Sequence, residues 1–366
     1  MKQGWEIKKL GEVCKLYQPK TISGEMLEEE GRYLVYGANG VIGRYNDYNH
    51  EESEVLLTCR GATCGSINIS EPYSWINGNA MVVKPVDKYS ISQSFLRYYL
   101  ESVDWSEVIT GAAQPQITRQ SLSPLSIQVP PIAEQEKIVA ELDCLSGIIE
   151  KKKQQLKELD NLAQSIFYEM FGDPDNSRFP KLPLQNLSEY KLSYGSGASA
   201  VEFDEDVRYV RITDIQEDGK LYSNAMSPSV YEEKYLLHDG DILFARSGAT
   251  VGKTYHYRNT DGKAIYAGYL IRFIPNQKLV LPEYVFYYTR SDYYHAFIRK
   301  SAQAVAQPNI NAKQYGDLIV CVPPLSLQQD FASKIESIEK QKELIAQSIK
   351  ETETLFNSRM DYYFNR

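Results

Sequence analysis

The sequence predicts an α+β protein in which two mixed α/β domains are joined by two long coiled-coil helices, with an internal pseudo-twofold repeat. Three observations lead to this prediction. The motif Ala113–Ile117 (AQPQI) returns 193 residues later as Ala306–Ile310 (AQPNI). At the same offset, Val129–Pro131 returns as Val322–Pro324, and each copy runs into a long segment with helical periodicity. A period of this length corresponds to one domain and one helix, duplicated, rather than to a solenoid of short repeats.

Length and composition limit the possible folds and the possible cell compartments. At 366 residues, 43% of them hydrophobic, the chain is long enough for two or more cores. It has no apolar run of 18 residues and no apolar signal-peptide segment near Met1, so we expect a cytoplasmic protein without a membrane span. Its five cysteines are scattered, as is typical of reduced thiols. Cys59 and Cys64 lack a neighbouring histidine or second cysteine pair, so we expect no metal site.

Each half begins with segments that have the character of strands. They are rich in β-branched and aromatic residues and are bounded by Gly, Asn and Pro. These segments are 54–58 and 80–83 in the first half, and 241–245 and 269–273 in the second. Short helices are expected to follow, at about 92–101 and 282–290. The Pro-Pro dipeptide that comes next cannot continue a strand ladder and suits the entry of a helix.

A glycine-bounded turn occurs in both halves, as Arg60–Gly65 (RGATCG) and Arg246–Gly252 (RSGATVG), with its glycines 187 residues apart. The second copy continues into Lys253 and resembles a phosphate-binding P-loop. Ser247 stands where that loop needs its first glycine, and the first copy has Ser66 in place of the lysine, so we expect no ATP site. Two interpretations stay open: a tight turn between strands, or a turn that donates hydrogen bonds to phosphates or base edges.

From Pro131 and from Pro324 onwards the periodicity becomes helical, with apolar residues at alternating spacings of four and three. In the first copy these are Ile138, Leu142, Leu145, Ile149, Leu156, Leu159, Ala163, Ile166 and Met170; in the second they are Phe331, Ile335, Ile338, Ile345, Ile349, Thr352 and Phe356. Lys152 in the first copy and Lys342 in the second are the only positions where a lysine interrupts the apolar stripe. Because each stripe is narrow, neither helix is stable alone in water, and we expect the two helices to pair with each other.

The charge is unevenly distributed. The net charge of −8 argues against a nucleic-acid partner, but residues 243–300 carry nine basic and three acidic side chains, whereas residues 201–241 carry four basic and eleven acidic ones. Residues 56–120 carry five of each. Twenty-eight tyrosines add flat amphipathic side chains that can pack on sugars and base edges. The plainer interpretation is that these charges are solvated faces and that the tyrosines fill strands.

No catalytic constellation is recognisable. The chain has no amino-methylation motif and no glycine-rich cofactor loop, and its four histidines are scattered without a metalloprotease or nucleophile-elbow pattern. The sequence therefore predicts no catalytic residues and no cofactor.

Taken together, these elements resemble the specificity (S) subunit of bacterial type I restriction–modification systems over essentially the whole chain. The resemblance is carried by Trp5–Val13, the glycine-bounded turn, Gln-Pro-x-Ile, the two helices, and Val-Pro-Pro followed at a fixed distance by Gln135 and Gln328. It implies two target recognition domains, 1–130 and 174–323. It also implies two spacer helices, 131–173 and 324–366, that pair antiparallel.

The resemblance also implies a function. Each recognition domain would read one half of a bipartite site in double-stranded DNA. In that family the S subunit is not an enzyme; it positions two adenine-methylating modification subunits and, in the full complex, two ATP-driven restriction subunits. Because Tyr36–Gly40 and Tyr209–Asp214 differ strongly, we expect an asymmetric target. The candidate DNA-binding residues are Arg60, Thr63, Arg246, Thr250, Lys253 and Arg258, with Arg60 taken as the repeat of Arg246.

Three other interpretations remain. A coiled-coil adaptor with two ligand-binding domains fits the architecture but leaves the basic stretch unexplained. A stand-alone nucleotide-dependent enzyme would need a working P-loop. The specificity subunit of a fused methylase–nuclease system differs from the favoured interpretation only in its partner.

Overall fold

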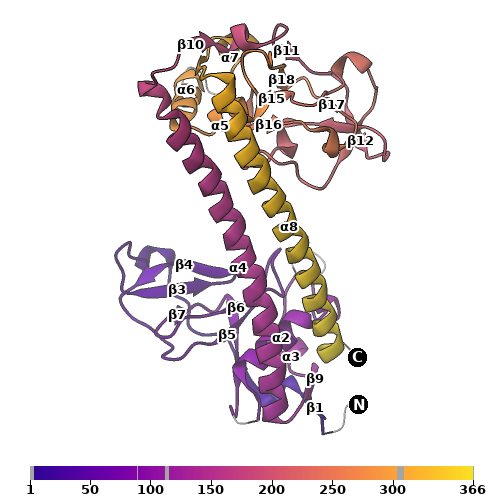
Figure 1. Ribbon diagram of the computed structural model, residues 1–366. Helices are drawn as coiled ribbons and strands as arrows, with labels where there is room; N and C mark the ends of the chain where they lie inside the picture. Colours follow the sequence, from indigo (N-terminus) through magenta and orange to yellow (C-terminus); the bar gives the residue numbers. More distant parts are fainter. Residues whose placement is uncertain (1–3, 89, 112–114, 303–308, 366) are drawn as a thin grey trace. The chain divides into compact units, whose positions relative to one another are not determined.

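The computed structural model describes residues 4–88, 90–111, 115–302 and 309–365 (Figure 1). Two parts of the repeated motif, 113–114 and 306–308, lie outside the described residues. The chain divides into two compact units. Unit 1 comprises Met1–Lys153 and Gln347–Arg366, and unit 2 comprises Gln154–Ala346.

Unit 1 contains a four-stranded antiparallel sheet in the order β2-β8-β5-β6. Its strands are β2 (Cys14–Tyr17), β5 (Val55–Thr58), β6 (Ile67–Ile69) and β8 (Ala80–Pro85). A second sheet, β4-β3-β7, is formed by β3 (Tyr33–Gly37), β4 (Gly40–Tyr45) and β7 (Trp75–Ile76), and a third joins β1 (Glu6–Lys9) to β9 (Ser126–Val129). The helices are α1 (Leu10–Val13), α2 (Gln93–Ser102) and α3 (Arg119–Leu122), with 3-10 turns η1 (Gly24–Met26) and η2 (Trp105–Glu107).

Unit 2 contains a four-stranded antiparallel sheet in the order β11-β18-β15-β16. Its strands are β11 (Ser193–Tyr194), β15 (Ile242–Ala245), β16 (Thr254–His256) and β18 (Leu270–Phe273). Three strand pairs accompany it: β10 (Lys181–Pro183) with β19 (Ile319–Cys321), β12 (Ala200–Glu202) with β14 (Met226–Pro228), and β13 (Arg208–Val210) with β17 (Ala264–Tyr266). The helices are α5 (Pro282–Tyr288), α6 (Asp292–Ala302) and α7 (Ala312–Gly316). The 3-10 turns are η3 (Pro174–Asn176), η4 (Leu184–Leu187), η5 (Ile212–Asp214), η6 (Glu233–Tyr235), η7 (Gly248–Thr250) and η8 (Asn259–Asp261).

The main sheets of the two units have the same topology, which confirms the internal repeat. Both are antiparallel, in the matching orders β2-β8-β5-β6 and β11-β18-β15-β16, and a short parallel pair accompanies each: β3 with β7 in unit 1 and β13 with β17 in unit 2. An antiparallel pair also leads into each long helix: β1 with β9, and β10 with β19. The predicted strands and short helices are confirmed to within one or two residues at their ends.

One inner strand of each main sheet, β5 in unit 1 and β15 in unit 2, is buried on both faces. This explains why that strand consists of a continuous apolar run. In unit 1, Leu57 packs in one core with Phe95 of α2, whereas Leu56 packs in another with Tyr36 of β3. Unit 2 repeats this division around β15, since alternate residues of a strand point to opposite faces. The sheet therefore lies between a helical layer and the short parallel strand pair in each unit.

The long helices are α4 (Ile132–Phe171) and α8 (Leu325–Phe364), and each contributes residues to both units (Figure 1). In unit 1, Arg359 Nε donates to Glu141 Oε1 at 2.5 Å, and Phe356 packs beside Tyr98 of α2. In unit 2, Phe167 packs against Phe331. Higher numbers on α4 thus meet lower numbers on α8, which confirms antiparallel pairing. Gly172 ends α4 in a left-handed conformation, with φ of 75°.

The two lysines that break the apolar stripes are both engaged across the helix pair. In unit 1, Lys152 Nζ donates to Ser348 Oγ at 2.5 Å and to Thr352 Oγ1 at 3.3 Å. In unit 2, the buried Lys342 forms ion pairs with Asp160 of α4 at 2.6 Å and with Glu339 at 2.9 Å. Polar groups buried in a helix seam can define its register. These two sets of partners differ, which favours pairing between unlike helices over self-pairing.

A buried glutamine explains why the Val-Pro-Pro motif is followed by Gln at a fixed distance. In unit 1, Gln135 Oε1 accepts from Ser92 N at 2.9 Å, and Nε2 donates to the carbonyls of Ser90 at 2.8 Å and Pro130 at 2.9 Å. Gln328 of unit 2 makes the equivalent three bonds, with Leu281 N, Leu279 O and Pro323 O. Each amide therefore connects the first turn of a long helix to the segment that precedes a short one.

Within the described ranges, no helix combines the length and the apolar character needed to cross a membrane.

Candidate nucleic-acid interface

The glycine-bounded turn is the hairpin that connects β5 to β6 in unit 1 and β15 to β16 in unit 2. Gly61 and Gly65 have φ of 86° and 97°, and Gly248 and Gly252 have φ of 70° and 89°. These left-handed conformations favour glycine, since other side chains are strained there. The backbone interpretation of the motif as a tight turn between strands is therefore confirmed.

Main-chain hydrogen bonds in this hairpin are the same in both units. In unit 1 the bonds are Gly65 N to Thr58 O at 2.9 Å, and Thr58 N to Ser66 O at 2.8 Å. In unit 2 they are Gly252 N to Ala245 O at 3.0 Å, and Ala245 N to Lys253 O at 2.9 Å. Ser66 is therefore the structural counterpart of Lys253, as the sequence predicted.

The expected equivalence of Arg60 and Arg246 is wrong. Cys59 O accepts from Ile117 N in unit 1, and Arg246 O accepts from Ile310 N in unit 2. One residue further on, Arg60 forms a bridge to Gln116, and Ser247 forms one to Asn309. The counterpart of Arg246 is thus the buried Cys59, and that of Arg60 is Ser247. Both arginines stand just before a glycine-bounded turn, but Arg60 is one residue before its glycine and Arg246 is two residues before, and the hydrogen bonds align the two hairpins by their glycines.

In unit 2 this end of the sheet carries a partly exposed arginine next to two exposed tyrosines. The Arg246 guanidinium lies over the Tyr194 ring, 4.7 Å from its centre, and Nε donates to Asn309 Oδ1 at 3.3 Å. Arg246 N also donates to Tyr269 O at 3.1 Å. Tyr194 is 41% exposed and Tyr269 is 62% exposed. Arg246, Tyr194, Tyr269 and Asn309, which we call the Arg246 cluster, form a cationic and aromatic surface.

The equivalent positions of unit 1 have different side chains. Strand pairing places Gln18 at the position of Tyr194, Cys59 at that of Arg246 and Asn79 at that of Tyr269. Gln18 Nε2 donates to Cys59 Sγ at 3.1 Å, and Cys59 Sγ donates to Asn79 O at 3.2 Å. At these three positions the same backbone thus carries uncharged amide and thiol groups in unit 1 and a cationic, aromatic set in unit 2.

The other predicted residues lie in three different settings. Arg60 and Thr63 are exposed on the hairpin of unit 1. On the hairpin of unit 2, Thr250 Oγ1 donates to Ser247 O at 3.2 Å, and Lys253 forms an ion pair with Glu217 at 2.8 Å. Arg258 is not on the hairpin; it precedes η8, where its N–H donates to Asp261 at 3.0 Å. Arg246, Thr250 and Lys253 are therefore brought together by one turn, whereas Arg258 lies apart and lines a separate cavity of about 530 Å³.

Sequence reasoning missed Tyr194, Tyr269, Gln18 and Asn79, because each adjoins the hairpin only through strand pairing. The abundance of tyrosine was the only signal for the first two. Asn309 lies within a motif that the sequence did single out, since it is the Asn of Gln-Pro-Asn-Ile.

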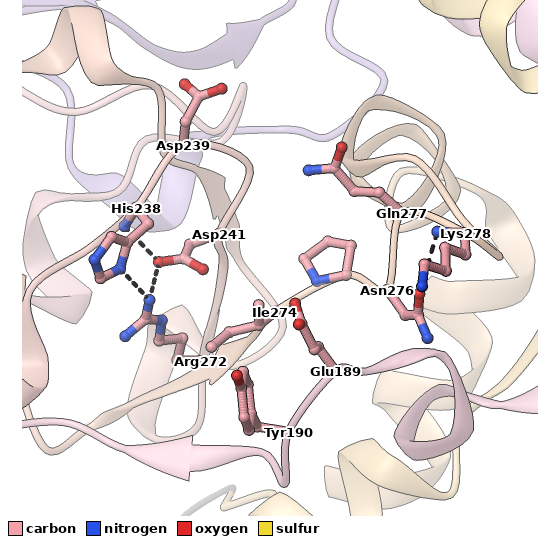
Figure 2. Close-up of a pocket in the computed structure, with 11 residues that line it drawn as sticks. Glu189, Tyr190, His238, Asp239, Asp241, Arg272, Ile274, Asn276, Gln277 and Lys278 are labelled. Carbon is pink, nitrogen blue, oxygen red and sulfur yellow. Dashed lines mark hydrogen bonds and ion pairs between the residues drawn. The ribbon is translucent and has the colours of Figure 1, made fainter.

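A polar cluster near the opposite end of β15 has a different character. A terminal nitrogen of Arg272 lies 2.5 Å from Asp241 Oδ2, and His238 is hydrogen-bonded to both residues. Figure 2 shows the three side chains directed toward one another. These residues line a cavity of about 670 Å³. Burial raises the pKa of the Asp241 carboxyl, whereas the hydrogen bond from His238 N and the charge of Arg272 oppose that shift. Because the buried charges pair with each other, this cluster does not offer a free cation to an anionic ligand.

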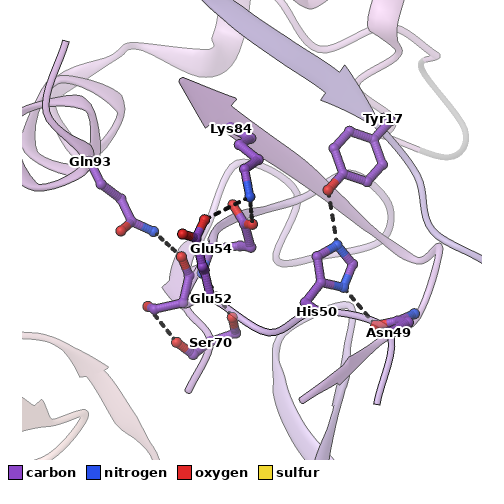
Figure 3. Close-up of polar contacts among 9 residues, drawn as sticks. Tyr17, Asn49, His50, Glu52, Glu54, Ser70, Lys84 and Gln93 are labelled. Carbon is purple, nitrogen blue, oxygen red and sulfur yellow. Dashed lines mark hydrogen bonds and ion pairs between the residues drawn. The ribbon is translucent and has the colours of Figure 1, made fainter. Parts of the chain in front are cut away.

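Unit 1 has a related cluster, shown in Figure 3. Lys84 lies between Glu54, at 2.5 Å, and Glu52, at 3.1 Å. Burial raises the pKa of the Glu54 carboxyl, and Lys84 opposes the shift. On the same face, His50 Nε2 is hydrogen-bonded to Tyr17 Oη at 2.9 Å. Glu54 and Asp241 are equivalent positions, just before β5 and β15. In both units this acidic residue is paired with a basic residue.

Comparison with known proteins agrees with the repeated architecture. The family described as type I restriction modification DNA specificity domain matches residues 2–161 and 196–354. A protein of Haemophilus influenzae, assigned as a type I restriction enzyme specificity subunit, is 23% identical over 92% of this chain and 88% of its own length. The type I restriction enzyme MjaVIII specificity subunit of Methanocaldococcus jannaschii is also 23% identical, over 92% of this chain and 86% of that protein. A crystal structure of the S subunit of a type I restriction–modification system from M. genitalium superposes with a TM-score of 0.63 and 14% identity. That similarity covers 98% of this chain and 96% of the other.

Proposed function

The chain belongs to the family of type I restriction–modification DNA specificity proteins, and on that premise we propose that it reads an asymmetric bipartite site in double-stranded DNA. Its function is to supply the DNA sequence specificity of such a system. Residues 1–130 and 174–323 are the proposed target recognition domains, each reading one half-site. Residues 131–173 and 324–366 are the proposed spacer helices.

The observation that carries this proposal is the shared hairpin with unlike neighbours. In both units the main chain of the hairpin makes the same hydrogen bonds, yet the side chains beside it differ: Tyr194, Arg246 and Tyr269 in unit 2, Gln18, Cys59 and Asn79 in unit 1. A protein that reads two different half-sites needs a constant scaffold and variable side chains. The proposed contacts to DNA are the predicted residues Arg60, Thr63, Arg246, Thr250, Lys253 and Arg258.

We further propose that the chain works as a non-catalytic subunit in the cytoplasm. Its partners would be two adenine-methyltransferase subunits and, in the full complex, the restriction and translocation subunits. The cofactors for methylation and the ATP for translocation would bind to those partners. A net charge of −8 is compatible with this role, since partners supply basic surface of their own and the second half keeps a local basic stretch.

The purified chain alone is therefore expected to transfer no methyl group to DNA. The measurement is the incorporation of label from S-adenosylmethionine into DNA that lacks the host modification. The same DNA should be labelled when the methyltransferase subunits of the same operon are added. Label transfer without those subunits would refute the non-catalytic role.

Mapping of methylated adenines in a host with the intact operon tests the function itself. We expect one asymmetric motif in two parts, separated by a spacer of constant length. The motif should disappear when only this chain is deleted. A coiled-coil adaptor would leave the methylation pattern unchanged, and a fused partner enzyme would give the same motif with a single polypeptide carrying methylase and nuclease.

Lys253→Ala should have only a small effect on DNA binding. Lys253 Nζ is paired with Glu217 at 2.8 Å and donates to Ile215 O at 3.3 Å, so part of its charge is already neutralised. One full phosphate contact would change the slope of log binding constant against log salt by about one unit. We expect a change below one unit, measured by titration of DNA with the assembled complex at several salt concentrations. A full unit would show that Lys253 leaves Glu217 when DNA binds.

A further inference from the structure

We propose that Arg246 reads a guanine in the half-site bound by unit 2, and that Tyr194 and Asn309 position its guanidinium. This inference rests on the proposed function, because it assumes that unit 2 binds DNA. It adds which side chain reads a base there and which base that is.

The Arg246 side chain is held in place by two neighbours. Its guanidinium stacks on the Tyr194 ring at 4.7 Å, and its Nε donates to Asn309 Oδ1 at 3.3 Å. The Tyr194 hydroxyl in turn accepts from Ala312 N at 3.0 Å, which ties the platform to α7. A guanidinium with its plane and its Nε engaged has its two terminal nitrogens directed away from the side chain as a fork. Within the described part of the chain, no residue accepts a hydrogen bond from those two nitrogens.

Arg246 differs electrostatically from the neighbouring cations. Lys253, on the same hairpin, is paired with Glu217, and Arg272, in the same sheet, is paired with Asp241. Among the described residues no carboxylate forms an ion pair with Arg246. Its charge therefore stays available to a partner, and since the stack already orders the side chain, binding would cost less conformational entropy.

The difference between the two units favours a base contact over a phosphate contact. Phosphates are the same in every sequence, so a residue that only grips the backbone could be retained in both units. The position of Arg246 is instead occupied in unit 1 by the buried Cys59, beside the amides of Gln18 and Asn79. A position whose side chain differs between the two units, while the backbone stays the same, is suited to reading a different base in each half-site.

The hydrogen-bond donors of the guanidinium then indicate which base Arg246 reads. A planar fork of two N–H donors matches the O6 and N7 acceptors of guanine in the major groove, whereas adenine offers one acceptor and one donor there. Tyr269, which is 62% exposed beside Arg246, adds an apolar flank next to that contact. The predicted half-site of unit 2 therefore contains a G·C pair that depends on Arg246.

The test compares methylation motifs of assembled complexes that carry the wild-type chain, Arg246→Lys or Arg246→Gln. Both variants should lose discrimination at a single G·C position of one half-site by about 5- to 150-fold, the range expected for one bidentate contact. The other half-site should stay unchanged, which also shows that the variant chain folds and assembles. Lys263→Gln is the control, because Lys263 is an exposed lysine of unit 2 that pairs with Asp206 and is not among the proposed contacts; it should leave every position of the motif intact.

The positioning role of Tyr194 has its own test. Tyr194→Leu should relax the same G·C position, whereas Tyr194→Phe, which keeps the ring, should retain most of the discrimination. If Arg246 only supported the fold, Tyr194→Phe and Tyr194→Leu would not separate at one base position.

Two results would overturn the inference. One is an unchanged motif in both Arg246 variants; the other is a uniform loss of binding to all sequences, which would assign Arg246 to a phosphate. Failure of the proposed function looks different, since the wild-type complex would then show no bipartite motif at all.

Discussion

Exchanging residues 174–323 for the corresponding segment of a relative is expected to replace one half of the recognised sequence and to leave the other half unchanged. The reason is that unit 2 has its own main sheet and its own cores, with the same topology as unit 1. Its reading side chains, on our proposal, are all within the exchanged segment. The measurement is the methylated motif of a host that carries the chimera with the native methyltransferase subunits.

The structure shows why the exchange should extend to 323. β19 pairs with β10, and the Tyr315 hydroxyl donates to Ala245 O at 2.7 Å inside the core of unit 2. An exchange that stopped at residue 300 would separate Tyr315 from its partner and would leave Asn309 beside a foreign hairpin. The inserted segment must also keep a large apolar residue at the position of Tyr284, because Tyr284 packs against Phe167 of α4.

The reciprocal exchange of residues 1–130 is the control, and it should change the other half-site only. If both halves of the motif changed in either chimera, the two domains would not read DNA independently. A change in spacer length with both half-sites intact would instead point to the helices.

Gln328→Leu is expected to lower the free energy of unfolding of unit 2 by about 3 kcal/mol, since it removes hydrogen bonds to three main-chain groups, each worth about 1 kcal/mol. These are the N–H of Leu281 and the carbonyls of Leu279 and Pro323, and Gln328 itself is 0% exposed. For a unit of this size, the loss corresponds to a fall in melting temperature of about 6–12 °C. Differential scanning calorimetry would measure it, with the transition of unit 1 as an internal reference.

Gln329→Leu is the matched control, because Gln329 is the adjacent residue of the same helix and is exposed. It should change the melting temperature little. Gln135→Leu should produce the same destabilisation in unit 1, where Gln135 makes three equivalent bonds. Equal effects of Gln328→Leu and Gln329→Leu would mean that the buried amide does not stabilise the junction.

Much of the fold could be predicted because its signals are local. The helices α4 and α8 follow from a periodicity that is written in consecutive turns, and the hairpin follows from glycines whose spacing is the same in both copies. Gln135 and Gln328 were recognisable as part of a repeated motif, although the three hydrogen bonds that each one makes were not. The family could be named for the same reason, since short motifs in a constant order suffice to identify it.

The candidate site was predicted only in part. Arg246 and Lys253 were selected for their charge and their turn, but the sequence paired Arg246 with the wrong counterpart. Matching the two arginines requires a one-residue gap before the glycine, whereas the hydrogen bonds donated by Ile117 N and Ile310 N align the two copies without a gap. The partners that distinguish the two cations, Tyr194 for Arg246 and Glu217 for Lys253, lie 52 and 36 residues away along the chain.

By itself, the sequence determined the duplication, the two helices, the hairpin and the family of this protein. Only the tertiary structure decided which cations are neutralised, as Arg272 is by Asp241, and which stay available, as Arg246 does. It also decided that Cys59 occupies the place of Arg246 in unit 1. The physical reason is that periodicity and turn chemistry act between neighbours in the chain. The free energy of a charge, in contrast, depends on groups that strand pairing and burial bring within a few ångströms from distant positions.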